Sequence, residues 1–248
     1  MATDAMRPQA IPQVRKANPA SDRVFFSLMI VLLWATVLFG FAKTYFLAGM
    51  VRAPLPNALI HIHGAVFTLW MVFLVVQEGL IAGRKITWHM QLGLVGFALA
   101  SAMVGLGLLA GVDALHRGST VPGLDSETFF IVPITAIAIF AVMIWLAFRF
   151  RYRAATHKRL IIIATITIAA AAIGRWPLAI LVRTPPLQNV VTLSFLLLIV
   201  AYDLLSQGRV LKSTLWAGLA LMVVQLVRIP IGMSPVWHAF ATFVGTHT

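Results

Sequence analysis

The residues of this chain that could carry chemistry are histidines and arginines placed within long apolar segments. His61 and His63 lie in the second such segment, Arg175 in the fifth and Arg228 in the seventh. An ionisable side chain near the centre of a membrane-spanning helix costs roughly 2.5–3.5 kcal/mol, so each one indicates a function or a partner. Together, imidazoles and guanidiniums would suit haem propionates, a quinone head group or a carboxylate. The alternative is that both arginines extend toward the nearer membrane surface.

Helical spacing separates the two neighbouring histidines. His61 and His63 are two residues apart, which is about 200° around a helix, so they cannot both face one partner. His63, Trp70 and Gln77 recur every seven residues and form one stripe. We therefore expect His63 to face the interior of the protein, near the outer leaflet. For His61, which lies beside small residues such as Gly64, we expect an interhelical hydrogen bond or a role as a second ligand.

A second polar cluster is predicted on the opposite side of the membrane. Glu78 ends the second apolar segment, His89 and His157 open the third and fifth, and Asp203 lies late in the sixth. The histidines could pair with either carboxylate, ligate a metal or bind a second haem. The alternative is that these residues only mark helix ends, with Asp203 holding a cytoplasmic arginine in place.

The segments that position these residues are long and apolar. Hydrophobic residues form 60% of the chain and charged residues 10%. Backbone polar groups inside a bilayer need internal partners, and runs longer than about 18 residues meet that need as helices. The sequence therefore predicts an all-α fold, a bundle of seven transmembrane helices. The expected helices cover residues 24–46, 58–83, 88–112, 126–148, 158–182, 188–206 and 213–233.

The domain organisation follows from the same pattern. Residues 1–22 are polar and contain three prolines, and we expect them to form a disordered cytoplasmic tail. Residues 23–238 are expected to form the transmembrane domain, and residues 239–248 a short outer tail. Helix-capping side chains are expected at the starts of four helices, contributed by Asp125 or Ser126, Thr87, Thr156 and Ser213.

Positive charges are distributed unequally between the two sides. Thirteen cations fall on the side of the N-terminus and four on the other, so the positive-inside rule predicts a cytoplasmic N-terminus and an external C-terminus. This topology accounts for the net charge of +12 without a nucleic-acid partner. The thirteen are Arg7, Arg15, Lys16, Arg23, Arg84, Lys85, Arg149, Arg151, Arg153, Lys158, Arg159, Arg209 and Lys212; the four are Lys43, Arg52, Arg117 and Arg183.

Several activities are disfavoured by what the sequence lacks. Cysteine is absent, which excludes disulfides, thiolate metal sites and a cysteine nucleophile. No phosphate-binding loop, H-E-x-x-H motif or glycine-rich dinucleotide loop is present. The seventh segment has no lysine near its middle, which argues against retinal binding.

The polar residues also carry a resemblance. His61-Ile-His63-Gly64, the stripe through Trp70 and Gln77, His89, His157-Lys158-Arg159, Arg175-Trp-Pro177 and Tyr202-Asp203 together resemble a group of uncharacterised bacterial seven-helix integral membrane proteins. More distantly, the chain is similar to histidine-bearing membrane proteins of cytochrome oxidase assembly. The resemblance implies a bacterial cytoplasmic (inner) membrane protein with a respiratory role. It implies haem, copper or quinone as the bound group and other respiratory-chain subunits as partners, besides the lipid bilayer.

Three functions remain open from the sequence. The first is a cofactor-binding protein in which His63 ligates a b-type haem or donates to a quinone, with Arg175 and Arg228 binding propionates or a carbonyl. The second is a transporter or channel for a small anion, in which the two arginines form the site. The third is an intramembrane zinc-dependent lipid hydrolase, although such enzymes carry a histidine pair in the last helix, and here His238 stands alone beyond it. Whether the chain is an enzyme is left open.

Overall fold

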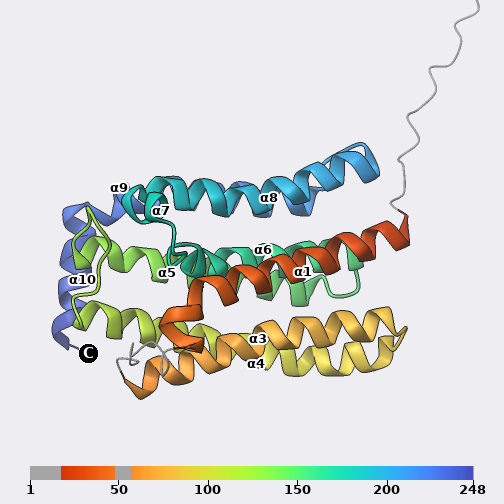
Figure 1. The fold of residues 1–248 in the computed structure, drawn as a ribbon, viewed down its shortest axis with the longest axis horizontal. Coiled ribbons are helices and arrows are strands. Elements are labelled where there is room, and N and C mark those ends of the chain that lie inside the picture. The colour runs from red at the N-terminus through yellow and green to blue at the C-terminus, as the bar shows by residue number, and fades with distance from the viewer. Residues whose placement is uncertain (1–17, 48–56, 248) are drawn as a thin grey trace, which may run out of the picture.

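The computed structural model describes residues 18–47 and 57–247, and in these ranges the chain is built from helices (Figure 1). Seven of the helices are long and apolar enough to cross a membrane, which confirms the predicted all-α seven-helix bundle. The elements are α1 (Pro19–Phe41) with the π-helical turn η1 (Ala42–Phe46), α3 (Ala58–Ala82), α4 (Ile86–His116), α5 (Ser126–Arg149), α6 (Ala154–Ile173), α7 (Ala179–Arg183), α8 (Pro185–Gln207), α9 (Lys212–Gly232) and α10 (Pro235–His247).

The two ends of the bundle differ in charge. The end at which α1 begins also holds the ends of α3, α5 and α8, and with them the described cations of the larger group; we call it the basic end. At the other end α10 lies across the axes of the long helices, and we call this the α10 end (Figure 1). The start of α1 and the end of α10 therefore lie at opposite ends of the bundle, as an odd number of spans requires.

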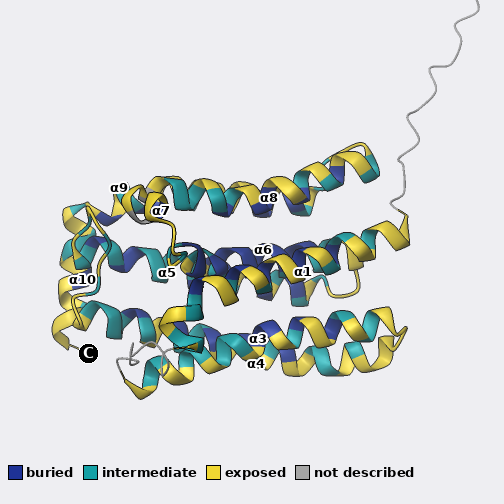
Figure 2. Ribbon diagram, viewed as in Figure 1, coloured by how far each residue is buried: buried dark blue, intermediate teal, exposed yellow. Residues whose placement is uncertain are grey.

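Helix α6 forms the centre of the bundle. It packs against α1, α5, α8 and α9, and 61% of its most apolar stretch is buried, against 17–33% in the other spans (Figure 2). The outward faces of the peripheral helices carry exposed leucine, valine and phenylalanine side chains, which is expected where lipid replaces water as the solvent. Side chains on α6 are thus best placed to contact several helices at once.

Two glycines permit close helix contacts. A Cβ atom added at Gly40 on α1 would lie 2.2 Å from the carbonyl oxygen of Ala172 on α6, so the two backbones approach too closely for any side chain. A Cβ at Gly107 on α4 would lie 2.8 Å from the side chain of Ile137 on α5. The small residues in these helices therefore serve packing.

The helix starts follow the predicted capping chemistry in part. Asp125 caps α5, its side chain accepting from the backbone N–H of Thr128, as predicted. Asn57 caps α3 in the same way. The predicted caps Thr87, Thr156 and Ser213 are wrong, because the N-cap residues of α4, α6 and α9 lie two or three residues earlier and make no side-chain cap hydrogen bond.

Three predicted boundaries need correction. Helix α1 begins at Pro19, capped by Asn18, so residues 19–22 are helical and only residues 1–17 of the predicted tail lie outside the described ranges. The helix predicted over residues 158–182 ends at Ile173, and the short helix α7 follows. Gly174 starts the turn after α6, and Pro177 could not donate to the carbonyl of Ile173, which disfavours a continued helix there. The predicted outer tail is instead helical as far as His247.

Candidate functional site

The basic end is fastened by a fully buried ion pair. The guanidinium of Arg159 on α6 donates to Oδ1 of Asp203 on α8 at 3.0 and 2.5 Å. Oδ2 accepts from the Thr214 hydroxyl at 2.6 Å and from the backbone N–H of Leu211 at 3.1 Å. The exposed fractions of the two charged side chains are 1% and 0%. Because both oxygens of Asp203 are occupied by protein donors, this carboxylate joins α6, α8 and α9 rather than offering a ligand position.

A second polar contact at this end joins α1 to its neighbours. Asp22 on α1 forms an ion pair with Lys158 on α6 and accepts a hydrogen bond from the Tyr202 hydroxyl on α8 at 3.1 Å. Glu78 on α3 accepts from the Ser27 hydroxyl on α1 at 2.6 Å. The two carboxylates proposed as partners of the basic-end histidines, Glu78 and Asp203, are therefore bound to other groups.

The two histidines of the predicted second cluster do come together. His89 on α4 and His157 on α6 lie with their ring centres 6.4 Å apart and their planes at 83°. Nδ1 of His157 lies 2.9 Å from the carbonyl oxygen of Ala147 on α5. Nδ1 of His89 is buried and has no hydrogen-bond partner in the described part of the chain. Of the residues predicted for the second polar cluster, the structure brings these two imidazoles together, and one further residue lies beside them.

That further residue is Gln77, which we had assigned to the His63 stripe. Its backbone carbonyl lies beside the ring of His89, and its side chain is only 8% exposed. The side-chain oxygen of Gln77 is buried without a partner among the described residues. Gln77 therefore belongs with the basic-end histidines, two helical turns from Trp70 and four from His63.

At the α10 end, His63 faces inward as predicted. Its ring stacks on Phe67 with centres 4.0 Å apart, and the backbone of Leu106 on α4 lies close by. Nδ1 of His63 is buried and makes no hydrogen bond to any described residue. Arg175, in the turn after α6, lies within electrostatic reach of this ring. One imidazole and one guanidinium thus lie in the same part of the α10 end.

The guanidinium of Arg175 is held at the surface of the bundle. It donates to the carbonyl of Ala171 at 2.8 Å and lies 5.0 Å above the ring of Phe41. The residue itself is exposed, which fits a group at the edge of a site rather than in its interior. The sequence predicts Arg175 within a helix, whereas the structure places it in an irregular turn.

The remaining predicted site residues lie apart from this pair. His61 is exposed and its ring lies 5.9 Å from that of Tyr45, whose hydroxyl donates to the His61 carbonyl at 3.2 Å. Trp70 is buried in the core, where its indole N–H donates to the Thr165 hydroxyl on α6 at 3.2 Å and its ring meets Phe140 on α5 edge-on. Trp70 therefore connects α3 to the central helix.

Arg228 forms a separate polar group on α9. It is 9% exposed and donates to the side-chain oxygen of Asn189 on α8 at 2.9 Å. Its Nε, and the side-chain oxygen of Gln225 one turn earlier, are buried without partners in the described ranges. Asn189 was not predicted, and its only signal in the sequence is a polar residue near the start of the sixth apolar segment.

Asp125 and His238, near α10, contact the same threonine. The carboxylate of Asp125 accepts from the backbone N–H and the hydroxyl of Thr128, both at 2.7 Å, and the backbone bond is the main cause that lowers the pKa of Asp125. His238 lies 3.0 Å from the same hydroxyl.

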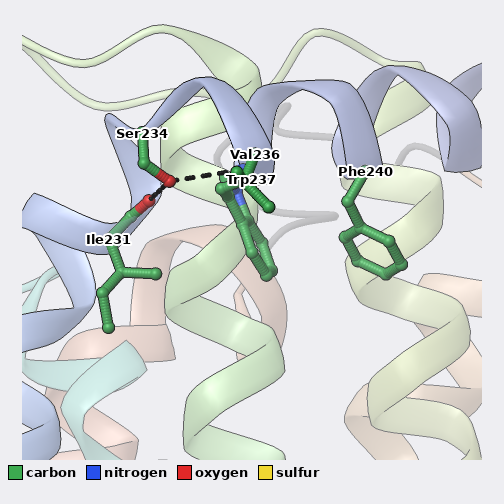
Figure 3. Close-up of a pocket in the computed structure, with 5 residues that line it drawn as sticks. All are labelled: Ile231, Ser234, Val236, Trp237 and Phe240. Carbon is green, nitrogen blue, oxygen red and sulfur yellow. Dashed lines mark hydrogen bonds between the residues drawn. The ribbon is translucent and has the colours of Figure 1, made fainter.

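A shallow apolar pocket lies where α9 meets α10 (Figure 3). None of its lining residues is ionisable; they are Ile231, Ser234, Val236, Trp237 and Phe240.

Comparison of the chain with protein-family models, curated proteins and solved structures found no match. Function therefore has to be argued from the described side chains. Within residues 18–47 and 57–247, no three histidine or carboxylate side chains gather as metal ligands would. The described side chains that could bind a ligand are the His63–Arg175 pair, the Arg228 group and the histidine pair at the basic end.

Proposed function

We propose that this multi-pass membrane protein binds a quinone head group at its α10 end, between His63 and Arg175, in the cytoplasmic membrane of a bacterium. The observation that carries the proposal is the buried Nδ1 of His63, which makes no hydrogen bond to a described residue and has a guanidinium nearby. A buried polar atom left without a partner costs about 1–3 kcal/mol, and a ligand that supplies the partner recovers this.

The chemistry of the two groups favours quinone over haem. The free Nδ1 of His63 accepts from a quinol hydroxyl when it holds the lone pair and donates to a quinone carbonyl when it carries the proton, and the second oxygen of the head group can accept from a guanidinium. A b-type haem would use His63 as an axial ligand and arginines for its propionates. The second arginine proposed for that role, Arg228, is instead bonded to Asn189, and the neighbouring histidine His61 is exposed beside Tyr45. The pair at this end therefore fits a quinone better than a haem with two histidine ligands.

A respiratory role follows from this choice. Quinones are lipid-soluble, and the outward face of α3 is apolar, with Ile62, Leu69 and Val76 exposed toward the lipid. A membrane protein that binds them acts together with enzymes that reduce or oxidise them. This is consistent with a place beside respiratory-chain subunits or in oxidase assembly.

The test is quinone content. The protein is purified in mild detergent from bacterial membranes and extracted with organic solvent, and quinone per chain is measured. We expect bound quinone in the wild type and in His61→Ala, a matched control two residues away, and its loss in His63→Ala and Arg175→Ala. The visible spectrum of the same samples reports haem. Equal quinone content in all four proteins would contradict the proposal, and a Soret band lost only in His63→Ala would replace quinone by haem.

A second candidate function rests on Arg228. Its guanidinium is buried, has no acidic partner among the described residues and keeps Nε without a hydrogen bond. A buried cation of this kind attracts a small anion, and Asn189 and Gln225 could share in its binding. Anion uptake into proteoliposomes that is abolished by Arg228→Ala and retained in Arg175→Ala would favour this function over quinone binding.

A further inference from the structure

The basic end of the bundle contains a second possible ligand site, independent of the His63–Arg175 pair. It consists of His89 and His157, contributed by two different helices and brought to 6.4 Å between ring centres. Both side chains are half-buried where α4 and α6 begin. The two sites lie at opposite ends of the bundle, so neither depends on the other (Figure 1).

The hydrogen bond of His157 fixes which nitrogen is available to a ligand. Its Nδ1 lies 2.9 Å from the carbonyl oxygen of Ala147, and a carbonyl can only accept, so Nδ1 must carry the proton. In the neutral imidazole the lone pair is then on Nε2. Histidines that ligate metals commonly donate their other N–H to a backbone carbonyl in this way, which fixes both the tautomer and the ring orientation.

His89 shows the complementary feature. Its Nδ1 is buried and has no hydrogen-bond partner within the described ranges, while the carbonyl of Gln77 lies beside the ring. A proton on the nitrogen that faces this carbonyl would leave the other nitrogen with a lone pair. The side-chain oxygen of Gln77, in a residue 8% exposed, is likewise buried without a described partner. An imidazole nitrogen and an amide oxygen in the same region thus both lack partners.

The separation of the rings leaves room for one metal ion between them. An imidazole nitrogen lies about 2.0–2.1 Å from a bound transition metal, and the ring centre lies about 1.2 Å beyond the nitrogen. Two imidazoles on one ion would therefore have their centres about 5.3 Å apart at the tetrahedral angle and about 6.4 Å apart on opposite sides of the ion. Each ring can rotate about its bond to the ion, so coordination of one ion allows the observed angle of 83° between the ring planes.

The ligands available around the two histidines determine which kind of metal ion they could bind. The carboxylate of Asp203 is paired with Arg159, one oxygen of Glu78 accepts from Ser27, and the chain has no cysteine. A site of two neutral imidazoles suits copper, zinc, nickel or iron and would not retain magnesium or calcium, which need several oxygen ligands.

We propose that His89 and His157 together ligate one transition-metal ion at the basic end, either as a bare ion or as the iron of a haem. The Ala147 carbonyl orients His157. A bare ion would keep open coordination positions, because His89 and His157 are the two imidazoles that the described part of the chain brings together here.

The experiment uses the full chain with a purification tag that contains no histidine. The metal content of the detergent-purified protein is measured, and the protein is then titrated separately with Zn²⁺, Cu²⁺ and haemin. We expect one ion or one haem per chain in the wild type and in His61→Ala. In His89→Ala and His157→Ala we expect binding to be weaker by at least about tenfold. A Soret band that appears with haemin and disappears in both variants identifies haem iron, and binding of Zn²⁺ or Cu²⁺ without it identifies a bare ion.

Two controls separate this site from a folding defect and from the proposed quinone site. His89→Gln and His157→Gln keep a polar side chain and are compared with the wild type by size-exclusion profile and helical circular dichroism. Loss of metal from well-folded variants with unchanged quinone content supports the proposal. It is overturned if the wild type binds none of the three probes, or if binding is the same in the wild type and all histidine variants.

Discussion

Removal of the buried carboxylate at the basic end is the most demanding test of how this bundle is held together. Asp203→Ala would leave the Arg159 guanidinium buried at 1% exposure without its counter-charge. It would also remove the acceptor of the Thr214 hydroxyl and of the Leu211 N–H. Loss of one partner of a buried ion pair costs about 3–5 kcal/mol. Since whole domains are stable by only about 5–15 kcal/mol, this one substitution should remove a large part of the free energy of unfolding.

The assay is reversible unfolding in mixed micelles of dodecyl maltoside and sodium dodecyl sulfate, followed by helical circular dichroism. Asp113→Ala is the matched control: it removes a partly exposed ion pair with Arg117, a kind of pair worth about 0–1 kcal/mol, and an exposed hydrogen bond from Asn57. Replacing both buried partners, as Asp203→Leu with Arg159→Met, should cost less than Asp203→Ala, because no buried charge remains. If Asp203→Ala costs no more than Asp113→Ala, the buried pair does not hold the basic end together.

Three further outcomes are expected. Gly40→Ala should lower the free energy of unfolding by about 1–3 kcal/mol, because the new methyl group meets the α6 backbone. Gly105→Ala has open space around it and should raise the free energy of unfolding slightly. The same micelle titration compares the two variants. Asp125→Ala should cost about 0.5–2 kcal/mol through the lost α5 cap. The pKa of Asp125 is lower in the folded than in the unfolded protein. Its contribution to the free energy of unfolding should therefore be present above the unfolded pKa of about 3.9 and be lost as the pH falls through the folded pKa. Unfolding of the wild type and of Asp125→Asn at a series of acidic pH values measures this loss. A reporter enzyme active only outside the cytoplasm should be active when fused after residue 248 and inactive when fused before residue 1; the opposite pattern would contradict the predicted orientation.

The fold could be predicted from the sequence because the bilayer restricts the possible structures. A run of apolar residues that is long enough must be a helix, and the clustering of cations fixes which ends of the helices lie together. The helix boundaries were less predictable where an apolar run continues past a turn. The stretch from Lys158 to Val182 is apolar almost throughout, yet α6 ends at Ile173, before Pro177. Helix α10 was missed because residues 235–247 are too short and too mixed in polarity to resemble a span.

The candidate sites were only partly predictable, since helical spacing gives the direction of a side chain within its own helix and not its neighbours. The inward face of His63 followed from its seven-residue spacing with Trp70. The same spacing grouped Gln77 with them, although four turns along the helix separate Gln77 from His63. Arg228 resembles Arg175 in the sequence, since each precedes a proline by two positions, but Arg175 lies in the turn after α6 and Arg228 on α9, and their partners differ.

The proposed ligand sites differ from the ion pair of Asp203 in whether their hydrogen bonds are satisfied. Asp203 has a protein donor at each oxygen, and its role is complete without any ligand. His63 and His89 each keep a buried ring nitrogen without a described partner, at a cost of about 1–3 kcal/mol apiece. A membrane protein has little hydrophobic driving force between its helices with which to offset such costs. The unsatisfied imidazoles are therefore the positions at which a bound group would stabilise the fold, and the satisfied carboxylates are not.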